Sequence, residues 1–414
     1  MDGEIGRFTF TTHNASHNGK SLYNTARDVF PVLHGVEVYK TIGFKDIAII
    51  HGDTEKSYRN TTQLINRIRY QEQDGTPSRT LHECTEREGN EVLNHIGKKA
   101  NSILAGNGFS TDGKCLASKA EYASEQLATI SKEQITAAID RCQQNANIVA
   151  DTLSNPVPYE DPQQSTNVAI DDVNVKKQEE SRPGGRKPHR GARKYVHNSI
   201  AHISKNGDGS YVLNGHGIKN VLLFLIAFLF HNGLTGTTRI QFFTDGHTIL
   251  NEAILLTFIW YKNIGIILDW FHLVKKCKER LSLALKGRII RNKILAELIP
   301  LLWYGSTDKA VAYLEGIAKN SIKDMGALDK LIEYLKRNKP YIPCYAVRKE
   351  LGLCNSSAIG EKMNDLVVSE RQKHNGMSWS KSGSVSLATI TALKRNKESA
   401  KWFENNELEF KLAA

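Results

Sequence analysis

The sequence predicts an α/β protein, with a mixed sheet and flanking helices in its second half and a mostly helical region before it. Between residues 195 and 414, short apolar runs of strand length alternate with longer apolar segments of helix length. Within residues 1–150, the segment 57–71 instead carries apolar side chains at helical spacing, at Leu64, Ile65 and Ile68. The polar stretch 151–194 separates these two parts, and its composition predicts a flexible linker.

The N-terminal region contains a candidate helix-turn-helix over residues 57–90. A helix is predicted up to the sequence QDGTPS, which breaks it, and Ser78 is a candidate N-cap for a second helix over 79–86. A further helix is expected over 92–104. Two helices joined by a short Gly-containing turn are compatible with DNA binding, although many helical bundles contain the same corner.

The linker begins acidic and ends strongly basic. Between residues 181 and 194 it has six basic residues and no acid, and its prolines and glycines disfavour a packed element. We interpret this end as a flexible arm that contacts phosphates; the alternative is an ordinary solvated linker. The basic residues of the arm are Arg182, Arg186, Lys187, Arg190, Arg193 and Lys194.

In the third part the elements are expected in the order β-β-α-β-α-β-α, with a helical insertion over about 280–345. Strands are predicted over 194–204, 210–213, 239–244 and 264–268, and helices over 217–234 and 248–261. The helix over 248–261 is apolar nearly all round, which predicts that it is buried.

Two aspartates, Asp245 and Asp269, directly follow short buried strands. Ligands of open α/β sheets bind at the carboxyl edge of the strands, so both side chains are expected there. Two carboxylates so close together repel each other unless a divalent cation binds between them. Mg²⁺ (or Mn²⁺) suits such a site because it binds carboxylate oxygens together with phosphate. Two such ions can activate the attacking oxygen and stabilise the leaving one in phosphodiester chemistry. The alternative for Asp245, which precedes a glycine, is an ordinary turn after a strand.

Three stretches together resemble the catalytic core of DDE-type transposases of bacterial insertion sequences, particularly groups related to mutator-like elements. They are FFTDGHTILNEAI, IILDWFHLVKKCKE and AIGEKMNDLVVSERQKHNGMSWS, and the resemblance covers roughly 194–395. It implies a ribonuclease-H-like catalytic domain over 195–414. It also implies that Asp245, Asp269 and Glu361 are catalytic metal ligands and that His272 supports the site.

Glu361 and His272 also have structural explanations. Glu361 lies in the first turn of a predicted helix capped by Ser357, where a carboxylate interacts favourably with the helix dipole. Asp365 is then the alternative acid. His272 follows a tryptophan and a phenylalanine, and its alternative is a core histidine whose hydrogen bonds are satisfied.

The sequence departs from the family in its first strand. The family has an aspartate there, whereas the predicted strand over 194–204 contains no acid, and a third strand of the meander is not evident. Asp208, in the turn KNGDG, is the only acid between Glu180 and Asp245. Either Asp208 or a non-carboxylate ligand has the role, or the strand is misaligned, or the enzyme has lost activity.

The formal net charge of +11 favours a polyanionic partner. One basic run follows Asp269 directly, and a second patch surrounds Trp379, which either stacks on an unpaired base or belongs to the core. DNA contacts are expected from Lys275, Lys276, Lys278, Arg280, Lys286, Arg288, Arg291, Lys293, Arg371 and Lys373.

These observations predict a transposase that cuts and joins double-stranded DNA at the ends of a mobile element and assembles on it as a homodimer. The alternatives are a degenerate relative that only binds nucleic acid and a nuclease of the same fold. The longest apolar run, 221–230, is too short to span a bilayer, and residues 1–14 lack the features of a signal peptide. The scattered cysteines suggest neither a disulfide framework nor a zinc knuckle. A cytoplasmic, nucleoid-associated prokaryotic protein is expected.

Overall fold

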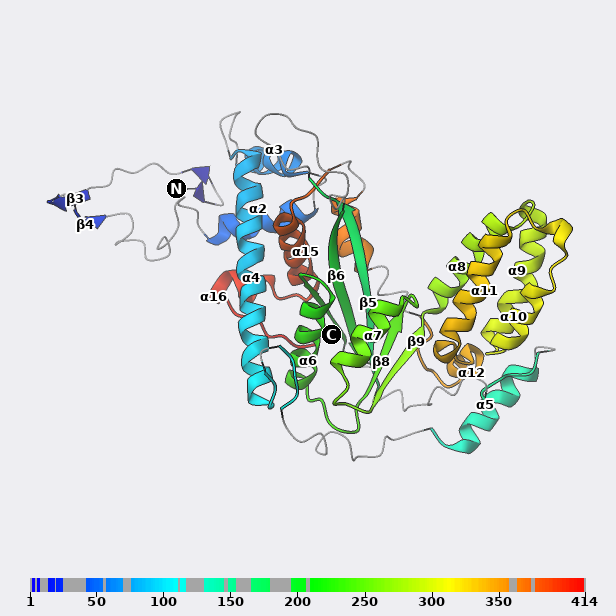
Figure 1. Ribbon diagram of the computed structural model, residues 1–414. Coiled ribbons are helices and arrows are strands. Elements are labelled where there is room, and N and C mark those ends of the chain that lie inside the picture. The colour runs from blue at the N-terminus through cyan, green and yellow to red at the C-terminus, as the bar shows by residue number, and fades with distance from the viewer. Residues whose placement is uncertain are drawn as a thin grey trace.

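A five-stranded mixed sheet forms the centre of the molecule, and helices pack against it and beyond one of its edges (Figure 1). The computed structural model describes residues 2–3, 6–7, 14–18, 20–24, 42–54, 57–69, 76–110, 112–116, 130–144, 148–153, 165–178, 195–205, 209–356, 363–373 and 377–412.

The strand order of the sheet is β7-β6-β5-β8-β9. An antiparallel meander is formed by β5 (Ser165–Lys176), β6 (Tyr195–Lys205) and β7 (Gly209–Gly215). The strands β8 (Arg239–Thr244) and β9 (Ile264–Leu268) continue the sheet parallel to β5. This order and these directions are consistent with a ribonuclease-H-like arrangement, and they confirm the predicted fold class.

The central strand β5 lies within the stretch 151–194, for which the sequence predicts a linker. It pairs with β6 on one side and with β8 on the other, and both of its faces are covered. Val168 and Ile170 belong to one hydrophobic cluster, whereas Val173 belongs to another. The linker prediction is therefore wrong for this strand, which also supplies the missing strand of the meander. The basic arm, 181–194, lies outside the described residues.

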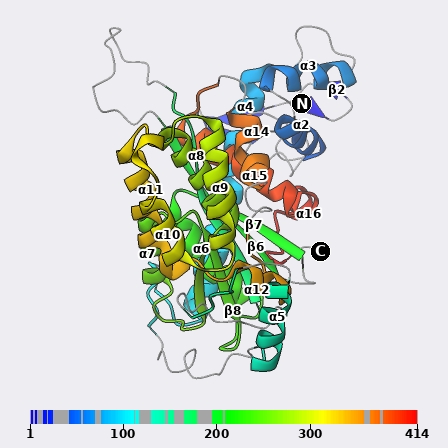
Figure 2. The ribbon, with the colours of Figure 1, turned by 90° about the vertical axis from the view of Figure 1, so that its right-hand side faces the viewer.

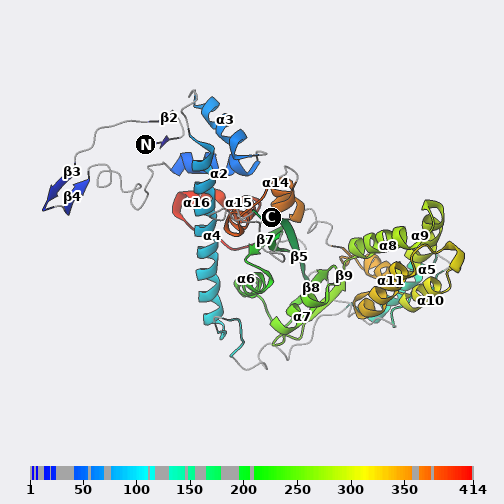
Figure 3. The same ribbon diagram turned by 45° about the horizontal axis from the view of Figure 1, so that its top comes forward.

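Long helices pack against the meander. The apolar helix α6 (Ile218–His231) and the long helix α4 (Ser78–Gly106) contact each other, and α15 (Lys381–Arg395) lies between α4 and the strands β6 and β7 (Figure 3). The crossing of α4 and α15 is close at Gly89, where an added Cβ atom would lie 2.3 Å from the carbonyl oxygen of Ser386. The helix α16 (Ser399–Asn405) follows α15.

The N-terminal region combines helices with two short hairpins. Its hairpins pair β1 (Asp2–Gly3) with β2 (Gly6–Arg7) and β3 (Asn14–His17) with β4 (Lys20–Asn24). Its first described helices are α2 (Ile42–Thr54) and α3 (Tyr58–Ile68), and α4 comes next. The separate helices predicted over 79–86 and 92–104 are wrong, because both ranges belong to the continuous helix α4. The second helix of the candidate helix-turn-helix is thus the start of a long helix that packs in the core.

A helical bundle lies beyond β9 and faces the viewer in Figure 2. It contains α8 (Trp270–Ala284), α9 (Arg288–Trp303), α10 (Thr307–Glu315), α11 (Met325–Asn338) and α12 (Tyr345–Glu350). These helices share a hydrophobic cluster with the end of β9, and α5 (Lys132–Gln144) packs against α12. The bundle includes the range of the predicted insertion, and its first helix starts directly after the sheet.

The helix α7 (Thr248–Thr257) is less buried than its composition predicts. Ile254 is buried, but Ile249 is 68% exposed and Leu256 is 71% exposed. The prediction of a fully buried helix is wrong because only one side of α7 meets the sheet and its neighbours. No helix in the described part of the chain is both long and apolar enough to cross a membrane.

Candidate active site

Three aspartates stand level with one another on the three neighbouring parallel strands. Asp245 and Asp269 directly follow the last register pair between β8 and β9, and the register between β5 and β8 brings Asp171 level with Asp245. Because neighbouring strands lie about 4.8 Å apart, level residues on them are close in space. The predicted edge with two aspartates therefore has a third member, which sequence reasoning missed.

Asp171 is a half-buried carboxylate held by two hydrogen bonds. The backbone N–H of Asp172 donates to its Oδ1 at 2.8 Å, and the side-chain amide of Asn364 donates to its Oδ2 at 3.0 Å. Burial raises the pKa of Asp171 to about 6, and the negative charge of Asp245 also raises it, whereas the hydrogen bond from Asp172 and the charge of His272 lower it. Asp171 is therefore close enough to Asp245 to feel its charge.

The neighbouring acid, Asp172, has a different environment. Successive side chains of a strand point to opposite faces, so Asp172 does not share the surroundings of Asp171. Its side chain is exposed and accepts a hydrogen bond from the hydroxyl of Ser199, its cross-strand neighbour on β6. Only the first acid of this Asp-Asp pair faces the edge where Asp245 lies.

Asp245 lies in a tight turn that holds its carboxylate at the sheet edge. The backbone N–H of His247 donates to Asp245 Oδ1 at 2.8 Å, and the Tyr334 hydroxyl donates to the Asp245 carbonyl at 2.9 Å. Gly246 has φ +79°, and a Cβ atom there would lie 2.8 Å from Asn338 Oδ1. The turn interpretation of Asp-Gly is thus compatible with the ligand interpretation, because the turn is what positions the half-buried carboxylate.

Asp269 is fully buried and caps α8. Its Oδ1 accepts the backbone N–H of His272 at 3.1 Å, and the Ser356 hydroxyl lies 3.3 and 3.4 Å from its two oxygens. The ring Nδ1 of His272 lies 3.6 Å from the same carboxylate. This geometry favours a capping role for Asp269 over that of an open metal ligand, with His272 beside both Asp269 and Asp171.

The other predicted acids do not complete a metal site among the described residues. Glu361 and Asp208 both lie outside those residues, and Asp365 is exposed in the π-helical turn η4 (Asp365–Ser369). No group of three or more His, Cys, Asp or Glu side chains that could hold a metal ion occurs in the described ranges. The charge of Asp245 nevertheless raises the pKa of Asp171, and such a pair suits a divalent cation, since the cation would neutralise the repulsion.

The predicted DNA-contacting side chains have different environments. Arg371 is 4% exposed, with its guanidinium over the rings of Tyr58 and Trp379, so the prediction that it contacts DNA is wrong. Trp379 is buried as a core residue, and Lys373 is exposed. The cations of α8 and α9 and of the turn between them are exposed or half-exposed: Lys275, Lys276, Lys278, Arg280, Lys286, Arg288, Arg291 and Lys293. The predicted cations of the arm lie outside the described residues.

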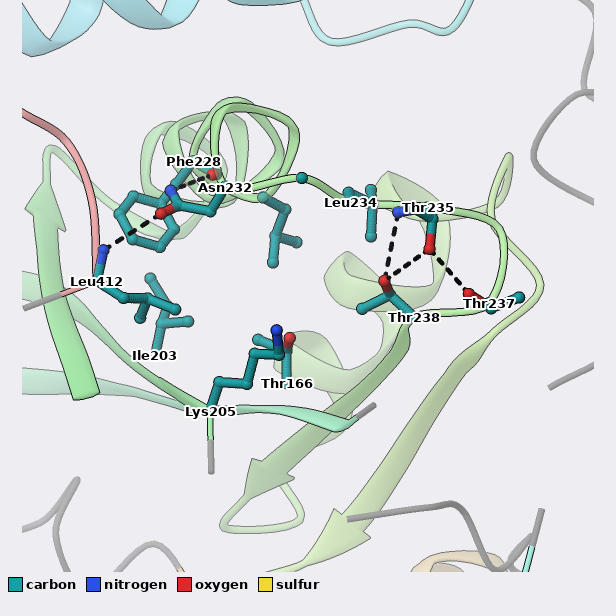
Figure 4. A pocket seen from close by; sticks show the side chains of 12 residues that line it. Thr166, Ile203, Lys205, Phe228, Asn232, Leu234, Thr235, Thr237, Thr238 and Leu412 are labelled. Atoms are coloured by element: carbon teal, nitrogen blue, oxygen red, sulfur yellow. Dashed lines mark hydrogen bonds between the residues drawn. The ribbon is translucent and has the colours of Figure 1, made fainter. Parts of the chain in front are cut away.

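A cavity of about 240 Å³ lies at the opposite end of the sheet, where β5 and β8 begin (Figure 4). Its rim includes Lys205, Asn232 and the turn Thr235–Thr238. Asn232 bonds the carbonyl of Phe410, and the hydroxyls of Thr235 and Thr238 bond each other at 3.2 Å. None of its lining residues in the described part of the chain is a carboxylate, and it lies away from the aspartate edge.

No protein-family model and no curated protein sequence matches the chain. A solved structure titled Drosophila P element transposase strand transfer complex is similar over 93% of this chain and 86% of that chain, with 12% sequence identity and a TM-score of 0.27. Because this TM-score is low, we argue function from the residues of the site itself.

Proposed function

We propose that this protein is a metal-dependent transposase that cuts and joins phosphodiester bonds of double-stranded DNA. The observation that carries the proposal is the pair of half-buried carboxylates, Asp171 and Asp245, level with each other on adjacent parallel strands of a ribonuclease-H-like sheet. The resemblance of the segments around Asp245, Asp269 and Glu361 to DDE-type transposases supports the same function.

In this proposal Asp171 and Asp245 hold the metal, and Glu361 is the third ligand. Mg²⁺ or Mn²⁺ bound there supplies activation of the attacking oxygen and stabilisation of the leaving one. The chain itself positions the carboxylates: Asn364 and a backbone N–H orient Asp171, and Tyr334 holds the turn of Asp245. Water is the first nucleophile and a 3′ hydroxyl of the element end the second. Preorganised ligands of this kind act mainly by positioning and electrostatics.

Asp171 also bears on the alternative of a degenerate DNA-binding relative. That alternative depended on the absence of an acid from the first strand. Asp171 lies on β5, the first strand of the sheet, level with Asp245, and this position supports assigning it the role of the first aspartate. Asp208, the candidate for this role from the sequence, is then not needed. A homodimer remains part of the proposal because two element ends must be joined.

The test is nicking of supercoiled plasmid with Mg²⁺ or Mn²⁺ by the wild type, Asp171→Asn and Asp245→Asn. Asp172→Asn is the matched control, because it removes the adjacent, exposed carboxylate and keeps the backbone N–H. We expect nicking by the wild type and the control, and none above the protein-free level by the other two. Nicking by Asp171→Asn at the wild-type rate would reject the assignment. Absence of nicking by the wild type, with DNA binding intact, would favour the degenerate binder.

A second assay separates a transposase from a nuclease of the same fold. Pre-cut oligonucleotide ends with a free 3′ hydroxyl are incubated with a target plasmid and the metal. A transposase joins the labelled end to the plasmid, whereas a nuclease only nicks it. Joining that requires Asp245 supports the transposase.

A further inference from the structure

A second cavity, of about 220 Å³, opens beside Asp245 on the side of the helical bundle. Three segments line it: the turn after β8, the helix α8 and the helix α11. Its charged lining consists of Lys276 and Arg280 from α8, Lys330, Glu333 and Arg337 from α11, and Asp245 itself.

The helical spacing of these residues explains why they converge. Lys276 and Arg280 are four residues apart on α8, and Lys330, Glu333, Tyr334 and Arg337 repeat at three and four residues on α11, so each set occupies one face of its helix. The two helices pack against each other, which brings both faces to the cavity. Four cations and two carboxylates give a formal net charge of +2 there.

The cations of this cavity differ from other cations of α11. Lys336 pairs with Glu315 at 2.7 Å, and Lys339, which comes directly after the helix, pairs with Asp308 at 2.6 Å. Among the described residues, none of the four cavity cations forms an ion pair. Side chains that repel one another and are left without carboxylate partners favour an anion from outside the chain.

Tyr334 joins this charged cluster to the aspartate turn. Lys276 Nζ lies 5.9 Å and the Arg337 guanidinium 5.8 Å from the centre of its ring, and its hydroxyl donates to the Asp245 carbonyl. The two cations therefore lie against a ring whose hydroxyl also fixes the position of Asp245. A group bound between them would have a fixed place relative to the carboxylate edge.

We infer that this cavity is a subsite for one backbone phosphate of a nucleic-acid strand, next to the phosphodiester that reaches the carboxylates. The inference deepens the proposed function and rests on it. Lys and Arg are the side chains that recognise phosphate, and the cavity directly adjoins Asp245, so it lies beside any strand bound at that carboxylate. Pockets for whole small molecules are typically about 300–1,000 Å³, so the volume suits a single phosphate group of a strand better than a free nucleotide.

The test measures DNA binding without metal, so that it does not depend on cleavage. Fluorescence anisotropy of a labelled duplex is recorded over a salt series for the wild type, the double variant Lys330→Gln/Arg337→Gln and the control Lys336→Gln. The control removes a cation of the same helix that has its own carboxylate partner. Loss of one phosphate contact is expected to reduce the slope of log K against log salt by about 1 in the double variant. The control is expected to keep the wild-type slope.

A second arm distinguishes a backbone phosphate from a free anion. Single uncharged methylphosphonate linkages are moved along one strand of the duplex. One position is expected to weaken binding of the wild type and to have no effect on the double variant. The inference would be overturned in favour of a free-anion site by two results together. Millimolar inorganic phosphate would abolish the difference in DNA binding between wild type and the double variant, and no single methylphosphonate position would weaken binding by the wild type. Equal slopes for the double variant and the control would overturn it altogether.

These outcomes are independent of the nicking assay. Nicking by the wild type together with wild-type binding by the double variant would reject the subsite and keep the proposed function. Loss of slope in the double variant without any nicking would keep the subsite and reject the enzyme. Circular dichroism of the double variant checks that its fold is unchanged, and Lys276→Gln provides a second variant from the other helix.

Discussion

Replacement of Asp171 by asparagine should stabilise the metal-free protein at neutral pH. The pKa of Asp171 rises from 3.8 to about 6 in the folded chain because of burial and the charge of Asp245. The folded state thus binds a proton more tightly than the unfolded state, so the wild type loses stability as the pH rises from about 4 to about 6. A rise of this size corresponds to at most about 3 kcal/mol. The amide of asparagine cannot ionise and keeps an acceptor for the Asp172 N–H, and its NH2 group can bond Asn364 once that amide turns its own oxygen toward it.

The assay is urea unfolding of wild type, Asp171→Asn and Asp172→Asn at pH 4.5 and pH 7.5, with and without Mg²⁺. Without metal, the stability of Asp171→Asn relative to wild type should be greater at pH 7.5 than at pH 4.5 by about 1–3 kcal/mol. With Mg²⁺ at pH 7.5 the wild type and Asp172→Asn should gain stability by mass action, and Asp171→Asn should not. The reasoning is refuted if Asp171→Asn has the same pH dependence as wild type, or if Mg²⁺ stabilises both equally.

Three further substitutions test the packing and positioning around the sheet. Gly89→Ala should lower the free energy of unfolding by roughly 1–3 kcal/mol, because its Cβ would lie 2.3 Å from a carbonyl oxygen of α15. Gly97→Ala is the control: it lies in the same helix, its Cβ would have nothing within 4 Å, and it should not destabilise the protein. Equal melting temperatures for the two variants would contradict the close crossing of α4 and α15. Asp269→Ala should lower the free energy of chemical unfolding by about 1–2 kcal/mol, because it removes the cap of α8. Asp269→Ser can still cap the helix, so it should recover most of this stability and should still be stabilised by Mg²⁺. If Mg²⁺ no longer stabilises Asp269→Ser, Asp269 is a metal ligand. Tyr334→Phe should lower the free energy of unfolding by about 1 kcal/mol, because it removes the hydrogen bond to the Asp245 carbonyl. It should also slow nicking while DNA affinity stays unchanged. Nicking at the wild-type rate would show that this bond does not position the turn.

The strand β5 could not be recognised from its pattern because its apolar phase changes in the middle. Val168 and Ile170 are apolar at even positions, and Val173 and Val175 at odd ones, with the two acids between them. The reason is the covering of both faces: the first pair packs in one cluster and the second pair in another. A search for simple alternation therefore fails at the Asp-Asp pair, whose first member is the proposed metal ligand Asp171.

The four strands predicted over 194–204, 210–213, 239–244 and 264–268 correspond to β6, β7, β8 and β9. The runs that became β8 and β9 are short, buried and directly followed by an aspartate, so strand and edge could be inferred together. The cavity between the bundle beyond β9 and Asp245 could not be predicted from the sequence. Lys330 and Arg337 are unremarkable cations on an amphipathic helix, and only the packing of α11 against α8 brings them to the cavity beside Asp245.

The equal register of Asp245 and Asp269 shows why position at a sheet edge does not by itself assign a role. Both residues directly follow a buried parallel strand, so the sequence pattern predicts the same role for both. The next residue along the chain differs: Gly246, with its positive φ, turns the chain after Asp245, whereas Trp270 starts a helix after Asp269. The helix presents a backbone N–H that Asp269 must cap, and burial removes that carboxylate from solvent. Among the described residues, the Asp245 carboxylate accepts a hydrogen bond only from its own turn, through one oxygen, and stays half-buried, which is why we propose it and Asp171 as the pair that shares a cation.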